Sequence, residues 1–229
     1  MSRADDILRW LAATGTRETV EGMARFGIPS NGAFGVTVGE MRRQAKAIGP
    51  DHEAARALWA DGRYEARMMA VLIGEPDVLT SEEADAWCAD FDNWAICDTA
   101  CFALFDRTDF RWEKVALWAV DPREFVRRAG FALVWALTTH DKKAENARFE
   151  AALALIEQQA GDERPLVKKA IDMALRATGK RNYHLHDKAL AACGRLETRE
   201  ERAAQWIGRH ARSELESAKV LERLSRKAK

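Results

Sequence analysis

The chain has 229 residues, enough for one large domain with a substantial core or for a series of small repeats that share one. Lys and Arg balance Asp and Glu at 36 each, so no net positive charge attracts the whole chain to nucleic acid or to an anionic membrane. Any such binding therefore requires a local patch of charge. Ala, Leu, Arg and Glu dominate and no long run alternates apolar and polar residues, which is typical of an all-helical protein.

The first segment, "MSRADDILRWLAATG", places acidic residues before its apolar ones and lacks the long apolar core of a signal peptide. No stretch approaches the roughly 20 apolar residues of a membrane-spanning helix. Cys88, Cys97, Cys101 and Cys193 form no paired Cys-x-x-Cys motif, so we interpret them as core residues of a reduced protein. We therefore expect a soluble, cytoplasmic protein with no membrane partner.

Turn residues separate short helical segments along the chain. The longest predicted loop runs from Gly27 to Gly35, and Thr37 with Glu40 after it has the spacing of a capping box that starts a helix. The same spacing predicts helix starts at two later places, Thr80 with Glu83 and Thr198 with Glu201. In all, the pattern predicts about a dozen helices of roughly 8 to 18 residues.

A repeated pattern links three of these segments, "DGRYEARMMAVLI" from Asp61, "DPREFVRRAGFAL" from Asp121 and "DERPLVKKAIDMAL" from Asp162. Each has an Asp, an Arg two residues later, and a cation four residues after that, followed by apolar residues at helical spacing. Helix pairs that recur every few tens of residues predict an α-solenoid of HEAT-like repeats, with an ordinary helical bundle as the alternative.

The repeated cations are Arg67, Arg127 and Lys168, and they return at the same helical position each time. A row of positive charge of this kind predicts a concave basic groove that follows a phosphate backbone. We expect one domain over residues 1–229, with residues 219–229 as a basic, solvated C-terminal tail.

The segment "FDNWAICDTACFALF", residues 91–105, predicts a core helix that carries one carboxylate, Asp98. Trp94 lies four residues before Asp98, so the two share one helix face. A buried, unpaired carboxylate costs several kcal/mol. From spacing alone, Asp98 is either a functional group beside an indole wall, or a buried residue that caps a neighbouring helix or pairs with Arg107 or Arg127.

The order of several segments resembles the AlkD-type DNA alkylation repair proteins, which are glycosylases built from HEAT-like repeats. These segments are "AFGVTVGEMRRQAK", "LWADGRYEARMMAVLI", "DNWAICD", "REFVRRAGFAL", "VKKAIDMALR" and "RAAQWIGRHARSEL". The resemblance extends roughly from Arg25 to Leu215. It implies a monomeric hydrolase that cleaves the N-glycosidic bond of cationic alkylpurines in double-stranded DNA, with no cofactor and with the lesion still stacked in the duplex.

The resemblance also implies roles for individual residues. Asp98 matches the catalytic aspartate of the family, Trp94 the tryptophan one turn before it, and Arg127 the arginine that holds the DNA backbone near the lesion. Met173 occupies the position of a second active-site tryptophan, and this departure bears on how strongly a lesion is bound. From the repeated cations, we expect Arg67 and Lys168 to contact phosphates as well.

Other candidate chemistry is weaker in this sequence. His184 and His186 are two residues apart, with Asp187 next to the second. Side chains at this spacing diverge on a helix, so we expect no metal site. No phosphate-binding glycine loop, nucleophile elbow or Cys-His pair indicates a cofactor or another reaction. Two alternatives to the glycosylase remain: a non-catalytic relative that binds distorted or branched DNA, and a HEAT scaffold that binds proteins.

Overall fold

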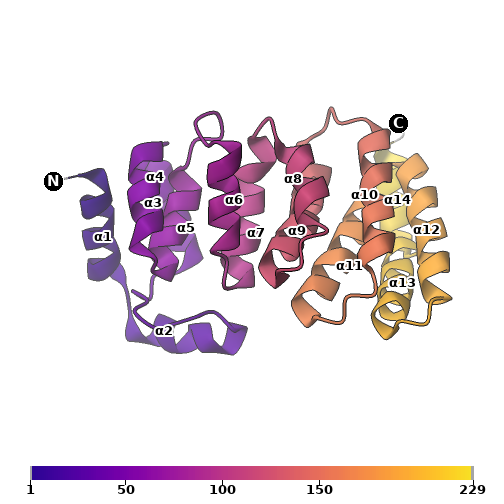
Figure 1. The fold of residues 1–229 in the computed structure, drawn as a ribbon, viewed down its shortest axis with the longest axis horizontal. Helices are drawn as coiled ribbons and strands as arrows, with labels where there is room; N and C mark the ends of the chain where they lie inside the picture. The colour runs from indigo at the N-terminus through magenta and orange to yellow at the C-terminus, as the bar shows by residue number, and fades with distance from the viewer. Residues whose placement is uncertain (1, 228–229) are drawn as a thin grey trace. The chain divides into compact units, whose positions relative to one another are not determined.

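The computed structural model describes residues 2–227, and the regular elements of this part are all helices (Figure 1). They are α1 (Arg3–Thr14), α2 (Arg17–Met23), η1 (Ala24–Phe26), α3 (Val38–Ile48), α4 (His52–Asp61), α5 (Tyr64–Ile73), α6 (Ser81–Ala89), α7 (Trp94–Ala103), η2 (Phe105–Arg107), α8 (Arg111–Trp118), α9 (Glu124–His140), α10 (Asn146–Gln159), α11 (Pro165–Gly179), α12 (Tyr183–Glu197), α13 (Arg202–Leu215) and α14 (Ala218–Lys227).

The helices group into two compact units, an N-terminal unit (Met1–Asp109) and a C-terminal unit (Phe110–Lys229). In the N-terminal unit, α5 packs against α3, α4 and α7. In the C-terminal unit, α9, α11 and α13 pack side by side in one layer, while α8, α10 and α12 form a second. These stacked helix pairs confirm the predicted helical repeats. The single domain and the basic groove stay predictions.

Helix starts follow the predicted caps only in part. Thr37 and Glu40 form a complete capping box on α3, as predicted. Thr80 accepts the backbone N–H of Glu83, but the Glu83 carboxylate bonds His52 and Arg56 instead of completing a box. The start predicted at Thr198 is wrong, because Thr198 ends α12, and α13 begins after Glu201 with no side-chain cap.

The repeated Asp-x-Arg motif has a local structural role. In each copy the Asp carboxylate accepts the backbone N–H of the Arg two residues later and binds its guanidinium through both oxygens. The Arg is the residue that precedes the first turn of the helix, at the start of α5, α9 and α11. The motif therefore fixes where the second helix of a repeat begins. The pairs are Asp61–Arg63, Asp121–Arg123 and Asp162–Arg164.

Close packing of helices inside the units depends on a glycine and on stacked aromatic rings. A Cβ on Gly130 of α9 would lie 2.4 Å from the backbone nitrogen of Ala119, so the approach of α9 to the end of α8 requires a glycine. In the N-terminal unit the buried rings of Trp59 and Trp87 stack with centroids 4.4 Å apart. The four cysteines are buried and unbridged, as expected for core residues.

The segment expected to be a basic tail is helical as far as Lys227. Val220 and Leu224 of α14 are buried, which docks this helix on its unit through contacts with α13. The apolar residues recur at helical spacing between the basic ones, a pattern that charge alone conceals. Residues 228 and 229 lie outside the described part.

Candidate functional site

The central helix of the site is α7, and it is held at its start by Asn93. The buried Asn93 side chain accepts the backbone N–H groups of Ala95 and Ile96, both at 3.0 Å. Trp94 and Asp98 are partly exposed, whereas five other residues of the helix are buried: Ala95, Ile96, Cys97, Ala100 and Cys101. Asp98 therefore lies at the edge of a core helix and is partly exposed, and both its catalytic role and its role as a structural cap or ion-pair partner stay predictions.

Trp94 is fixed by a residue that the sequence analysis did not select. Its indole Nε1 donates to the backbone carbonyl of Phe26 at 2.8 Å. Phe26 is 65% exposed, more than any other large apolar residue in the described part of the chain. An aromatic residue directly before the long predicted loop was the available signal. The site thus includes the end of η1 as well as α7.

The same loop is anchored by Glu65 of α5, a second residue that was missed. Glu65 is 0% exposed, and its carboxylate accepts the backbone N–H groups of Phe34 (3.1 Å), Gly35 (2.7 Å) and Val36 (3.4 Å). Gly35 has φ of +86°, and a Cβ there would lie 2.1 Å from the Thr16 carbonyl oxygen, so only glycine fits. Glu65 lies between Arg63 and Arg67, before the apolar run that starts at Met68, so no local pattern in the sequence marks it.

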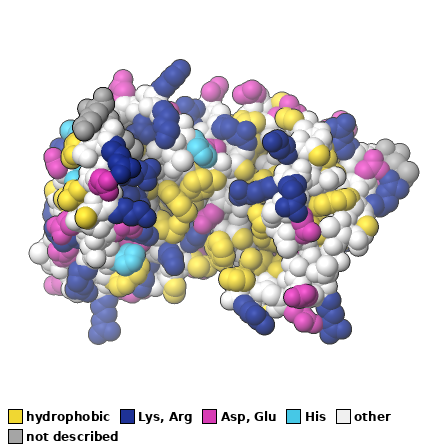
Figure 2. All heavy atoms as spheres, turned by 180° about the vertical axis from the view of Figure 1, so that it is seen from behind, with side chains coloured by type: hydrophobic (Ala, Val, Ile, Leu, Met, Phe, Trp, Pro, Cys, Tyr) yellow, Lys and Arg dark blue, Asp and Glu magenta, His cyan; other side chains and the backbone are white. Residues whose placement is uncertain are grey.

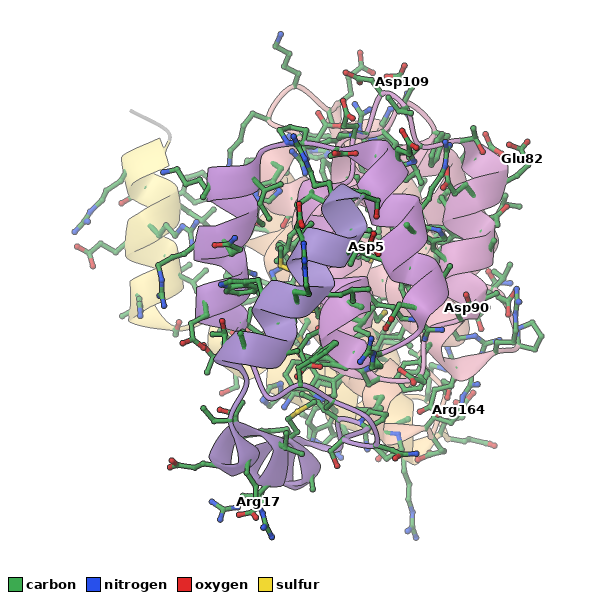
Figure 3. All side chains as sticks on the ribbon, turned by 90° about the vertical axis from the view of Figure 1, so that its left-hand side faces the viewer. Asp5, Arg17, Glu82, Asp90, Asp109 and Arg164 are labelled. Carbon is green, nitrogen blue, oxygen red and sulfur yellow. The ribbon has the colours of Figure 1, made fainter. Side chains whose placement is uncertain are left out.

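A cavity of about 300 Å³ lies beside the starts of α5 and α7. Arg67 lines it, donates from Nη1 to the carbonyl of Asp90 at 3.2 Å, and covers the Trp59 ring at 5.2 Å. Its Nε is buried and has no hydrogen-bond partner in the described part of the chain. Asp90, labelled in Figure 3, also accepts the Trp59 indole N–H at 3.0 Å. The remaining lining residues are Pro29, Asn31, Asp61, Gly62, Arg63, Tyr64, Asp92, Asn93 and Ile96.

Arg127, in the C-terminal unit, is already engaged with protein groups. Its Nη1 donates to the Asp162 carboxylate at 2.7 Å and its Nε to the Asp121 carbonyl at 2.9 Å, and its side chain is 17% exposed. Asp162 belongs to the next repeat and also binds Arg164. Although its burial opposes ionisation, its arginine partners hold the pKa of Asp162 below its usual value.

Lys168 and Met173 of α11 are both partly exposed. The Lys168 ammonium lies 5.1 Å from the centre of the Trp206 ring of α13. Met173 follows the buried Asp172, whose carboxylate binds Arg176 and His210. The repeated cation thus contacts the following helical repeat in every copy, through a carbonyl for Arg67, a carboxylate for Arg127 and a ring for Lys168.

The histidines near Asp187 have separate partners. His184 Nε2 bonds Glu150 at 2.7 Å, and His186 Nδ1 contacts the Gly179 carbonyl at 3.1 Å. Within residues 2–227 no group of three or more His, Cys, Asp or Glu side chains is arranged to hold a metal ion. None of the described helices has the length and apolar character needed to cross a membrane.

The predicted site residues divide between the units. Trp94, Asp98 and Arg67 belong to the N-terminal unit, and Arg127, Lys168 and Met173 to the C-terminal unit. Within the N-terminal unit, Trp94 and Arg67 contact or face the loop that starts at Phe26, and the partly exposed Asp98 lies one turn after Trp94. Such a set can oppose a developing positive charge and contact bases, but it lacks a nucleophile paired with a base.

Residues 7–215 match the family model described as DNA alkylation repair enzyme. The chain belongs to this family. The DNA alkylation repair enzyme family is thereby shown for most of the sequence, as the resemblance of the repeated segments predicts.

A solved structure also matches the fold of this DNA alkylation repair family member. It is described as a new family of proteins related to the HEAT-like repeat DNA glycosylases with affinity for branched DNA structures. The TM-score is 0.76 with 20% sequence identity, over 91% of this chain and 94% of the other. At this identity the likeness shows the fold, an all-helical structure of HEAT-like repeats. A search of curated proteins gives no significant match.

Proposed function

We propose that the protein is a DNA glycosylase that hydrolyses the N-glycosidic bond of N7-alkylguanine and N3-alkyladenine in duplex DNA. The observation that carries the proposal is the pair of Trp94 and Asp98, partly exposed one turn apart on a helix whose other residues are mostly buried. Membership of a repair family supports it. In this proposal Arg67, Arg127 and Lys168 contact the DNA backbone, and Met173 lies near the lesion.

The chemistry follows from the charge of the lesion. An alkylated purine is cationic, and breaking its glycosidic bond builds positive charge on the sugar, as in sugar hydrolysis. A fixed carboxylate attracts that growing charge more strongly in the transition state than in the ground state. At about 4 Å and an effective dielectric constant near 20 the attraction is about 4 kcal/mol, an upper figure for a partly exposed group.

The same charge removes the need for a general acid. The base leaves as a neutral purine from a cationic precursor, so no proton has to be supplied to it. Asp98 would also orient the water that attacks the sugar. Trp94, held by the Phe26 carbonyl, offers a rigid aromatic surface beside the lesion nucleotide, where a cationic sugar or base gains roughly 0.5 to 2 kcal/mol.

The test is release of free 7-methylguanine from methylated duplex DNA, with the parent compared with Asp98→Asn. The substitution keeps the shape and removes the charge, so we expect excision to fall by at least about a hundredfold while DNA binding holds. Glu82→Gln is the matched control, because Glu82 is exposed on α6 of the same unit (Figure 3). Equal excision by parent and Asp98→Asn would contradict the catalytic assignment.

A second candidate function is binding of branched DNA without catalysis. It is favoured by the affinity described for the structurally similar protein and by methionine at position 173. This function predicts tight binding of a four-way junction and no release of 7-methylguanine. A scaffold for proteins predicts neither DNA affinity nor base release.

A further inference from the structure

A second, basic cavity lies entirely within the C-terminal unit. It measures about 130 Å³ and forms where the ends of α9 and α11 meet α14. Figure 2 shows several Lys and Arg side chains grouped over this unit, at the left of the view from behind. The cavity is lined by Trp135, Thr138, Thr139, Lys142, Ala177, Lys180, Arg181 and Arg223.

Arg181 holds one wall of the cavity in place. Its guanidinium donates to the backbone carbonyls of Thr138 (3.2 Å), Asp141 (2.8 Å), Lys142 (3.2 Å) and Ala144 (3.1 Å). These bonds hold the segment after α9 against the end of α11. Arg181 thus places the Lys142 backbone at the cavity, and its main task is structural.

The cavity keeps an excess of positive charge. Lys180 Nζ binds Glu214 at 2.6 Å, and Arg176, which shares this carboxylate, also binds Asp172, so the excess charge comes from Lys142 and Arg223. Lys142 and Arg223 are exposed, and neither side chain has an ion pair or hydrogen bond within residues 2–227. None of the described residues that line the cavity carries a carboxylate.

The volume and the positive charge of this cavity indicate which kind of ligand it can bind. Pockets for whole cofactors and drug-sized ligands occupy about 300 to 1,000 Å³. A cavity of about 130 Å³ instead suits a single oxyanion group, and converging Lys and Arg side chains bind phosphate oxygens. We propose that this cavity binds one backbone phosphate of DNA, and so gives the C-terminal unit a DNA contact separate from Asp98. The proposal rests on the proposed DNA-binding function.

The test uses two double variants of the full chain. Lys142→Gln with Arg223→Gln removes the two cavity cations that have no partner. Lys143→Gln with Arg226→Gln removes equal charge from the same loop and helix, from two exposed cations that do not line the cavity. Arg181 is left intact because its loss would disturb the fold. Melting curves check that both variants fold as the parent does.

Binding to an unmodified duplex is measured against salt concentration. We expect the cavity variant to bind about tenfold more weakly and to lower the salt slope by about one unit, the effect of losing one phosphate contact. The matched variant should change the slope by much less. Equal slopes for the two variants, or a parent that binds no duplex at low salt, would overturn the proposal.

Inorganic phosphate distinguishes the source of the ligand. If phosphate raises the melting temperature of the parent but not of the cavity variant, while both bind duplex equally, the cavity takes free phosphate and the DNA assignment is overturned. Release of 7-methylguanine is measured in parallel. A parent that releases no base but shows the slope difference contradicts the glycosylase proposal and leaves this inference standing.

Discussion

At the scale of a residue, Arg127 has an observed ion pair and a proposed DNA contact. The ion pair with Asp162 stabilises the C-terminal unit, and the proposed phosphate contact uses the same guanidinium. Arg127→Ala should therefore cost about 2 kcal/mol of unfolding free energy, because it removes one partner of a buried carboxylate that keeps Arg164. It should also lower the salt slope of duplex binding by about one unit.

Asp162→Asn separates these two effects. It removes the ion pair but keeps the charge of Arg127, so it should lower the melting temperature without weakening DNA binding. An unchanged salt slope in Arg127→Ala would show that Arg127 serves the fold alone.

A second prediction at the scale of a residue concerns the substitution of Met173. Methionine fills space but has no ring quadrupole, whereas tryptophan offers an aromatic face to a cationic sugar or base. Met173→Trp should raise single-turnover excision of 7-methylguanine by up to about tenfold, which corresponds to about 1.4 kcal/mol. Met173 is partly exposed, which leaves room for the larger ring.

The control for this substitution is the melting temperature, because overpacking by the larger ring typically costs about 1 to 3 kcal/mol and would lower it. A well-folded Met173→Trp that binds DNA but excises no faster would place Met173 away from the lesion.

The sequence predicted the positions of Trp94 and Asp98 on one helix face, because helical spacing is local. It could not predict that Phe26 and Glu65 belong to the site. Those facts depend on a loop about 30 residues away from α5 and about 70 from α7, and no periodic pattern encodes such contacts.

At the scale of an element, the loop between η1 and α3 depends on Glu65. Glu65→Gln replaces one acceptor oxygen with an NH₂ group that faces backbone donors. We expect a loss of about 1 to 3 kcal/mol of unfolding free energy. Amide exchange of Phe34, Gly35 and Val36 should become faster than in the parent, whereas amides of α11 should keep their protection. Unchanged exchange in this loop would show that other contacts hold it.

The start of each element illustrates the limits of local rules. Thr37 was predicted correctly because both halves of its box are close in sequence. Thr80 and Thr198 have the same spacing, but Glu83 is drawn to His52 and Arg56, and Glu201 to Arg199. Competing ion pairs, one between distant segments and one between near neighbours, therefore decide which of these spacings become caps.

At the scale of the whole molecule, several carboxylates have a lowered pKa in the folded chain because arginines bind them, among them Asp61, Asp121 and Asp162. A pKa lower in the folded than in the unfolded state adds stability above the unfolded value, about 3.9 for aspartate, and this stability is lost as the pH falls through the folded value. The melting temperature should therefore fall steeply below about pH 4.

Asp162→Asn tests this pH dependence. Its melting temperature should be lower than that of the parent at pH 7, and the difference should shrink as the pH falls below about 4. A difference that stays constant down to pH 3 would show that ionisation of Asp162 does not matter.

The all-helical repeat architecture was predictable because the Asp-x-Arg motif and the apolar spacing recur. Helix α14 was not predictable in the same way, because it depends on burying Val220 and Leu224 against its own unit.

The forward contacts of Arg127 and Lys168 also affect how the C-terminal unit comes apart. Because Asp162 joins the cation of one repeat to the first turn of the next, the start of α11 cannot fray without releasing an arginine of α9. In a chain of such nearest-neighbour links, rupture spreads from a free end. Under a force applied at the C-terminus, α12 to α14 should peel away first, and α9 with α11 should yield together in one larger step.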